Sequence, residues 1–286
     1  MGIKMIVTVK QVPDTHNVSA NAMKPDGTVN RAILPTIFNP EDLNALEEAL
    51  KIKDALGGTV TCITMGPPKA ADVLKECLFR GADDVILVSD RRFAGADTLA
   101  TSYALKSTIE KIGAYDLIFC GRQAIDGDTA QVGPQIAEKL KINQLCNASE
   151  VVAVDEKSIT IKRLTEYGNE TLKSKFPCLV TVTAEANDPR APSAKRVMRY
   201  KKIASLKTQN YGEAYLENNS QIPHIKEWDV DTIGADPVQC GLSGSPTKVK
   251  EIQTVVLKAG EIKQISNNES EITALVHQLI NEHILG

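Results

Sequence analysis

Four short apolar runs, each paired with a stretch of helical spacing, constrain the fold of this chain more than any other feature. The runs lie at 5–9, 60–65, 85–88 and 117–120, and the helical patterns at about 41–56, 69–80, 96–113 and 130–140. Continuous apolar runs are typical of parallel strands buried on both faces. Their alternation with helices predicts an α/β fold: an open, mostly parallel sheet with helices on both faces.

The pattern changes after about residue 148. Apolar and polar residues alternate at 151–154, 159–164 and 170–173, which predicts a β-meander at about 150–175. The apolar run 178–183 is expected to return to the main sheet. Residues 203–247 are polar and rich in turn formers, and 269–284 has the spacing of an amphipathic helix. We therefore divide the chain into an α/β domain (1–202) and an extended C-terminal arm (203–286). The stretch 203–247 is expected to be either disordered or ordered against a partner, and the helix at 269–284 either packs on this chain or docks on a partner.

Composition excludes several classes of protein. A net charge of -3 gives no reason to expect nucleic acid or an anionic membrane surface as a partner. No apolar run approaches the roughly 20 residues of a membrane span, and the first residues lack the pattern of a signal peptide. The six cysteines are scattered and the four histidines have no ligand spacing, so we expect a cytoplasmic protein with reduced thiols and no metal site.

The turn after the fourth apolar run is the strongest candidate for a ligand site. It runs from Gly121 to Gly133 between a buried strand and a helix start, an arrangement whose backbone N–H groups and helix dipole favour a phosphate. Glycines such as Gly121 and Gly127 let a ligand approach the backbone. Asp126 and Asp128 suit either Mg²⁺ or a helix cap, and we favour capping, with Asp128 supporting a helix start at 129. The turn predicts a nucleotide site.

Other polar or small residues follow different strands of the predicted sheet. Because the carboxyl ends of parallel strands meet at one edge, these residues are expected to converge, although each alone also fits a strand end, a turn or a helix cap. No P-loop, no G-x-G-x-x-G at the first helix and no G-x-S-x-G occurs, which favours a protein that holds a cofactor over one with its own acid–base machinery. The additional candidates are Lys10, Asn39, Gly66, Asp97, Thr98 and Thr101.

Several motifs occur together: VKQVPD at 9–14, NPEDLNALEEA at 39–49, MGPP at 65–68, GRQAIDGDTAQ at 121–131, NDPR at 187–190 and GLSGSPT at 241–247. In this combination the chain resembles the beta, or small, subunit of electron-transfer flavoproteins, over about the first 200 residues and 241–247. The resemblance implies an adenine-nucleotide-hydrolase-like fold, an obligate alpha subunit that carries an FAD, and a C-terminal arm and helix that embrace it.

The family has two groups. The beta site of ordinary members holds a structural AMP, whereas in electron-bifurcating members it holds a second FAD that takes a hydride from NADH. The stretch 89–104, with Gly127 and Thr129, resembles the bifurcating group. The resemblance implies an adenosine end at Thr8, Asn39 and Met65, and a flavin end at Asp97, Thr98 and Thr101. The pyrophosphate would lie on Arg122, Gln123, Ala124, Asp126, Gly127, Asp128, Thr129, Ala130, Gln131, Val132 and Gly133.

The same resemblance implies partners and leaves two rivals open. Partner docking falls to Pro189, Arg190, Ala194, Lys195 and Arg196, with Ala194 where relatives that serve acyl-CoA dehydrogenases carry an anchoring leucine. We expect a flavin-dependent dehydrogenase of acyl-CoA, enoyl-CoA or 2-hydroxy-acid type as partner, and ferredoxin as the low-potential acceptor. The rivals are a conventional beta subunit with AMP and one-electron relay, and a non-redox adenine-nucleotide-binding regulatory module.

Overall fold

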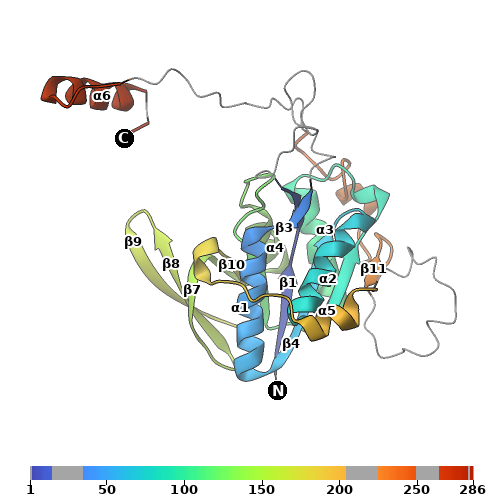
Figure 1. Cartoon of the computed structure of the whole chain (residues 1–286). Helices are drawn as coiled ribbons and strands as arrows, with labels where there is room; N and C mark the ends of the chain where they lie inside the picture. The colour runs from blue at the N-terminus through green and yellow to red at the C-terminus, as the bar shows by residue number, and fades with distance from the viewer. Residues whose placement is uncertain (1, 15–34, 204–224, 249–263, 283, 286) are drawn as a thin grey trace.

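A nine-stranded sheet in the order β11-β5-β4-β1-β6-β10-β7-β8-β9 organises the molecule (Figure 1). The computed structural model describes residues 2–14, 35–203, 225–248, 264–282 and 284–285. The strands from β11 to β7 pair in parallel, which confirms the predicted α/β class. The central ones are β1 (Ile3–Thr8), β4 (Gly58–Met65), β5 (Asp84–Val88), β6 (Leu117–Gly121) and β10 (Cys178–Val182).

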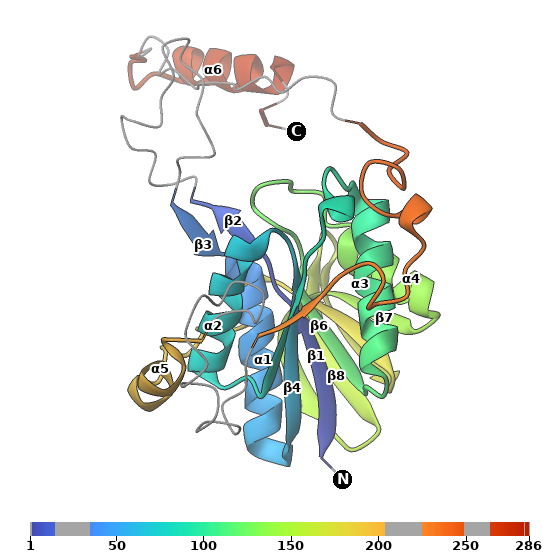
Figure 2. The same cartoon turned by 90° about the vertical axis from the view of Figure 1, so that its right-hand side faces the viewer.

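Helices cover both faces of the sheet, as Figure 2 shows. Successive side chains of β1 point to opposite faces: Met5 and Val7 join a buried cluster with Leu46 of α1, whereas Ile6 joins a second cluster with Ile109 of α3. Both faces are therefore cores, which explains the continuous apolar runs. The helices are α1 (Pro40–Leu56) and α2 (Ala71–Arg80) on one face, and α3 (Thr98–Ile112) and α4 (Val132–Leu140) on the other.

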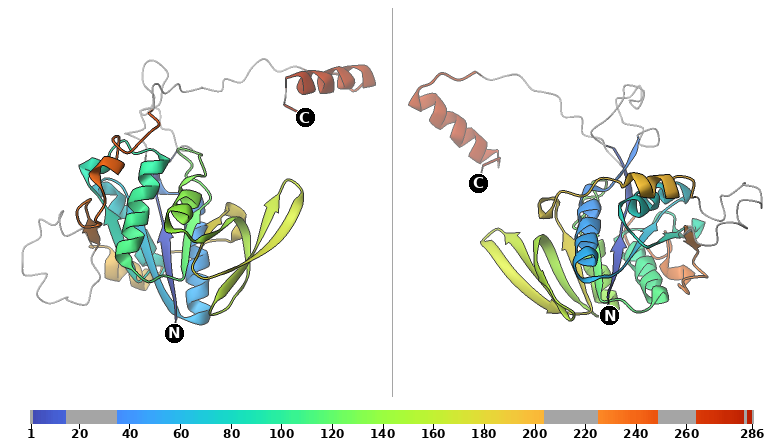
Figure 3. Two further views of the ribbon diagram at one scale, coloured as in Figure 1. Left: turned by 180° about the vertical axis from the view of Figure 1, so that it is seen from behind. Right: turned by 60° about the horizontal axis from the view of Figure 1, so that its bottom comes forward.

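The predicted β-meander extends one side of the sheet (Figure 3). It consists of β7 (Asn143–Val154), β8 (Ser158–Thr165) and β9 (Gly168–Lys175), paired antiparallel. β7 begins earlier than its alternating pattern indicates, because Asn143 already pairs in parallel with Cys178 of β10. The 178–183 run returns to the main sheet as expected, between β6 and β7.

The segment 225–248 corrects the expected boundary of the arm. β11 (Lys226–Trp228) pairs in parallel with β5 at the edge of the main sheet. Val230, Ile233 and Cys240 are then buried in the core on the α3 side. These residues belong to the α/β domain rather than to an arm, and their apolar positions are too scattered among turn formers to signal it. The remaining parts of the predicted arm at 204–224 and 249–263 lie outside the described residues.

Three smaller elements complete the description. β2 (Gln11–Pro13) and β3 (Thr36–Phe38) form a separate antiparallel pair, and α5 (Ala194–Tyr200) packs beside α2. The C-terminal helix α6 (Glu269–Asn281) buries none of its residues and stands apart from the sheet (Figures 1 and 3). In the described ranges, no helix is both long and apolar enough to cross a bilayer.

Candidate functional site

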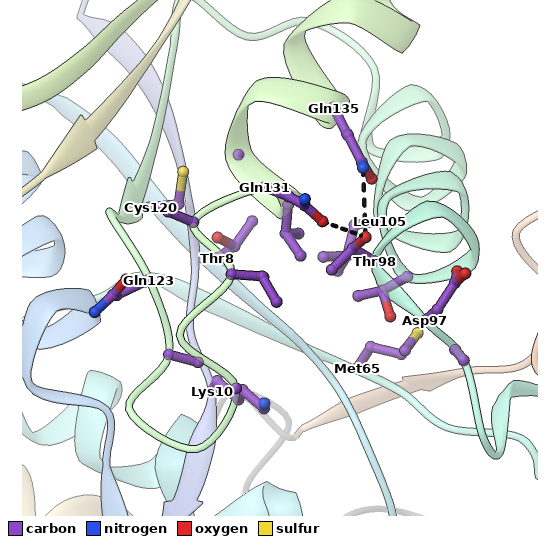
Figure 4. Close-up of a pocket in the computed structure, with 18 of the residues that line it drawn as sticks. Thr8, Lys10, Met65, Asp97, Thr98, Leu105, Cys120, Gln123, Gln131 and Gln135 are labelled. Carbon is purple, nitrogen blue, oxygen red and sulfur yellow. Dashed lines mark hydrogen bonds between the residues drawn. The ribbon is translucent and has the colours of Figure 1, made fainter. Parts of the chain in front are cut away.

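A pocket of about 960 Å³ lies at the carboxyl ends of β1, β4 and β6 (Figure 4). The chain runs from β1 outward to β4 and β5, then returns to β6 on the other side of β1. Such a reversal of strand order opens a crevice in which α/β proteins bind their ligands. All the predicted cofactor residues line this one pocket except Asn39 and Gly66.

Asn39 and Gly66 have structural roles beside the pocket. Asn39 precedes α1, yet its side chain makes no cap hydrogen bond. Instead its amide donates to the Gln123 carbonyl (2.9 Å) and accepts from the Ile125 N–H (3.1 Å), so it holds the 121–133 loop from behind. A Cβ on Gly66 would lie 2.9 Å from the Cβ of Ala70, so this glycine serves packing. The prediction that Asn39 caps α1 is wrong, and neither Asn39 nor Gly66 is among the residues that line the pocket.

The buried carboxylate of Asp42, in the first turn of α1, ties two strand ends together. It accepts from the Lys10 N–H at the end of β1 and from the Gly121 N–H at the end of β6, both at 2.9 Å. Burial raises the pKa of Asp42 to about 7, against the opposing effect of these hydrogen bonds. Asp42 itself lines the pocket. Sequence analysis missed it because its partner Gly121 is 79 residues away in the chain.

Glu41 fixes the beginning of the 121–133 loop in the same way. Its carboxylate accepts from the Gln123 N–H at 2.9 Å and pairs with the Arg122 guanidinium at 3.0 Å. The α1 start therefore determines the path of the loop as it leaves β6. The only local signal for this role was a pair of acids directly after Asn39-Pro40.

Gly121 and Gly127 of the loop have different functions. A Cβ on Gly121 would lie 2.5 Å from the Asp42 Oδ1 and 2.7 Å from the Asp42 backbone nitrogen, so its absence is required by α1 rather than by a ligand. A Cβ on Gly127 would meet nothing within 4 Å. Only Gly127 has the open surroundings that a ligand approaching the backbone needs.

The rest of the loop lines the pocket, although the N–H groups of Gly127 and Asp128 donate to the Ala124 carbonyl within the turn. Asp128 (φ 48) and Ala130 (φ 52) are left-handed, and Ala130 is followed by the right-handed Gln131. Such a left-to-right alternation forms a concave arrangement of N–H groups that suits an anion. α4 begins at Val132 with no side-chain cap, so the expected helix start at 129 is wrong. Asp128 instead accepts from the Gln123 side chain at 3.2 Å.

The start of α3 differs chemically from the start of α4. Asp97 caps α3 by accepting from the Leu99 and Ala100 N–H groups at 2.9 and 3.0 Å. Partial burial raises the pKa of Asp97, but hydrogen bonds from Ala100, Thr247 and Leu99 outweigh it and hold the pKa below its ordinary value. A carboxylate already occupies this helix start, which leaves the uncapped start of α4 for an anionic ligand.

Amide and hydroxyl side chains join α3 and α4 beside the pocket, as Figure 4 shows. The Thr98 hydroxyl donates to Gln131 (2.9 Å) and accepts from Gln135 (3.4 Å), and the Ser102 hydroxyl donates to Gln135 (2.9 Å). Thr98 and Gln131 were predicted site residues, whereas Gln135 and Ser102 were missed. Both lie within helical patterns whose polar positions carry no signal of a pocket.

Both cations of the lining, Lys10 and Arg122, are already paired with carboxylates of the protein. Lys10 Nζ pairs with Asp126 Oδ1 at 2.6 Å, and Arg122 pairs with Glu41. A phosphate would therefore depend more on backbone amides than on unpaired cations. Among the described residues, no group of three or more histidine, cysteine or acidic side chains is placed to hold a metal ion.

The predicted docking residues lie beside α1 and α2. Arg190 binds Glu47 through Nε (2.9 Å) and Nη2 (3.0 Å) and Asp54 through Nη1 (2.8 Å), so it fastens its segment to α1. Ala194 and Lys195 are exposed at the start of α5, and Pro189 and Arg196 are half-buried.

Comparison with known proteins agrees with this geometry. Residues 26–206 match the electron transfer flavoprotein domain. Electron transfer flavoprotein subunit beta of Clostridium acetobutylicum is 43% identical over 284 residues, which cover 99% of this chain and 100% of the relative. The caffeyl-CoA reductase-Etf complex subunit CarD of Acetobacterium woodii (41%) and the acryloyl-CoA reductase electron transfer subunit gamma of Anaerotignum propionicum (40%) are covered equally. The chain therefore belongs to the electron transfer flavoprotein family, among its beta subunits.

Proposed function

We propose that this beta subunit holds an FAD in the pocket and takes part in electron bifurcation. When bound, the flavin would accept a hydride from NADH and release the two electrons singly, one to a ferredoxin-like acceptor and one, through the alpha-subunit FAD, to a dehydrogenase. The volume of the pocket carries this proposal. At about 960 Å³ it reaches the upper end of the range of ~300–1,000 Å³ for ligand pockets, and so favours a dinucleotide over a mononucleotide.

The lining divides into regions that fit the parts of FAD. The left-handed Ala130 and the uncapped start of α4 offer amides and a positive dipole to the pyrophosphate. Thr8 and Met65 line the strand ends at which we place adenosine, and Thr98 and Thr101 of α3 line the region at which we place the flavin. Backbone and hydroxyl groups thus bind and orient the cofactor.

The partners that we propose are an alpha subunit and a flavin-dependent dehydrogenase, in the cytoplasm. Relatives are named as subunits of a caffeyl-CoA reductase complex and of acryloyl-CoA reductase, which supports an enoyl-CoA type over an acyl-CoA or 2-hydroxy-acid type. The exposed apolar residues of α6, among them Ile272, Val276 and Ile280, support its docking on the alpha subunit. Family membership leaves no support for the non-redox regulatory module.

A conventional subunit with structural AMP is the second candidate. The hydrogen bond between Thr98 and Gln131 joins α3 to α4 at the proposed flavin end, and it favours a shorter ligand.

Filling the flavin end separates the two candidates. In the heterodimer of this chain and its alpha subunit, we expect Thr101→Phe to remove the beta-site FAD, whereas AMP would be retained. Released nucleotides are quantified by chromatography, with Thr101→Ser as the control and an unchanged thermal midpoint as the test of folding. A T101F protein that keeps two FAD per heterodimer would contradict the placement of the flavin.

A further inference from the structure

A short strap, residues 240–247, lies against the pocket wall formed by residues 92–98. Ser245 follows Asp97 by 148 residues in the chain, yet the two are hydrogen-bonded. Pro246 and Thr247 themselves line the pocket. The strap contains the GLSGSPT motif, which the binding regions described above leave without a role.

Backbone packing presses the strap onto the wall. Gly241 is left-handed (φ +54), and a Cβ there would lie 2.2 Å from the Arg92 carbonyl oxygen. The Leu242 N–H donates to the Ala94 carbonyl at 3.2 Å. The Leu242 side chain fills the space beside Gly95, where a Cβ would lie 2.6 Å from the Leu242 Cγ. Gly241 and Gly95 are therefore both required for the strap to pack against the wall.

Two hydroxyl groups then fasten Asp97 to the strap. The Ser245 hydroxyl is buried, donates to the Gly241 carbonyl at 2.6 Å and accepts from the Asp97 N–H at 2.8 Å. Thr247 donates to the Asp97 Oδ2 through its N–H (3.1 Å) and its hydroxyl (2.7 Å). The other oxygen of Asp97 caps α3. One carboxylate therefore holds the helix start with one oxygen and the strap with the other.

We propose that Ser245 and Thr247 are positioning residues that hold the 92–98 wall and the start of α3 against the bound nucleotide. This inference rests on the proposed nucleotide-binding function of the pocket. The strap places no reactive group in the site. It fixes the wall from which Thr98 and Thr101 face the cavity, so loosening it speeds nucleotide release without dismantling the sheet.

Conservative variants of the two hydrogen-bond partners test the proposal in the full heterodimer. Thr247→Val removes the hydroxyl, whereas Thr247→Ser keeps it. Asp97→Asn keeps an oxygen to cap α3 but places an NH₂ group opposite Thr247. Thr232→Val removes the hydroxyl that bonds Asp229 in the same 225–248 segment, away from the pocket, and is the control. Amide hydrogen exchange of peptides covering 94–101 and the rate of nucleotide release are measured.

We expect T247V and D97N to speed exchange at 94–101 and to speed nucleotide release roughly three- to tenfold, because the lost hydrogen bond involves a charged group. The double variant should add little to either single one. T247S and T232V should match the wild type. If T247V leaves hydrogen exchange at 94–101 unchanged, the strap does not hold this wall in place. If exchange becomes faster but nucleotide release does not, the strap holds the wall but has no role in nucleotide binding. If the wild-type beta site holds no nucleotide while T247V still speeds exchange, the proposed function fails and the mechanical role of the strap stands.

Discussion

At the scale of single residues, the pocket depends on groups that hold its backbone in place. Three such residues lie at the start of α1, namely Asn39, Glu41 and Asp42. Their side chains fix the end of β1, the end of β6 and the first turns of the loop. None of these bonds reaches toward the cavity as a ligand contact. These bonds fix the path of the loop from Gly121 to Ile125.

Gly121 and Gly127 of the loop give a matched pair of variants. Gly121→Ala should cost about 1–3 kcal/mol of unfolding free energy, because its Cβ would overlap the backbone and carboxylate of Asp42. Gly127→Ala, with nothing within 4 Å, should change the unfolding free energy by less than about 0.5 kcal/mol but lower the nucleotide content. Urea denaturation and nucleotide release measure the two effects. Equal destabilisation by both variants would contradict the packing at Gly121.

Asp42 should make stability depend on pH. Its pKa is about 7 in the folded protein against an ordinary value of 3.8, so the folded state binds the extra proton between these values. The free energy of unfolding should therefore fall as pH rises through this window, by up to ~1.4 kcal/mol per pH unit from this group. The positive charge of Lys10 lowers this pKa, but by less than burial raises it.

Asp42→Asn removes the titration, at the cost of one of the two backbone hydrogen bonds. The free energy of unfolding of the variant, relative to that of the wild type, should therefore rise as the pH increases from about 4 to about 7. Urea denaturation of both proteins across this range gives the difference. A constant difference would mean that Asp42 does not titrate there.

At the scale of elements, α6 is the part of the described chain that is least integrated into the fold. Its apolar stripe includes Val276, which is 41% exposed, and Ala274 lies on the opposite side of the helix. Val276→Glu should weaken association with the alpha subunit at least about tenfold, because the added charge would be buried on docking. Ala274→Glu adds the same charge and should have little effect.

Deletion of 264–286 should abolish the heterodimer and leave the thermal midpoint of the isolated chain unchanged, because α6 buries no residue. The cut is placed after Thr247 so that the strap is kept. Size-exclusion chromatography with light scattering measures the assembly. A stable truncated heterodimer would show that α6 is not the docking element.

Elements differed in how far sequence could predict them. The runs that became β1, β4, β5 and β6 were evident because both faces of these strands are buried, so the apolar pattern is continuous. β11 was missed because it has three residues and lies among turn formers. The start of α4 was placed too early because left-handed residues such as Ala130 lengthen the turn, and no propensity signals a left-handed alanine.

The residues of the candidate site also differed in how far the sequence could predict them. Residues within the loop were predicted because its Gly/Asp composition and its position after a strand have a physical meaning. Asp42, Gln135 and Thr247 were missed because they reach the pocket only through tertiary packing. Asp42 and Thr247 make hydrogen bonds across 79 and 150 residues of chain.

At the scale of the whole molecule, the chain crosses the region of the pocket at several separate points. The first strand, the helix after it, the fourth and sixth strands and the 240–247 strap all contribute to one cavity. The C-terminal part thus returns to the α/β domain before it continues toward α6. In our proposal, cofactor binding and partner docking therefore fall to consecutive segments of the same chain.

The cofactor content of the purified alpha–beta heterodimer tests the central claim most directly. The nucleotides are released by denaturation and quantified by chromatography against the protein concentration. The account predicts two FAD and no AMP per heterodimer. One FAD with one AMP would contradict it, and would make this chain the structural subunit of a conventional electron carrier.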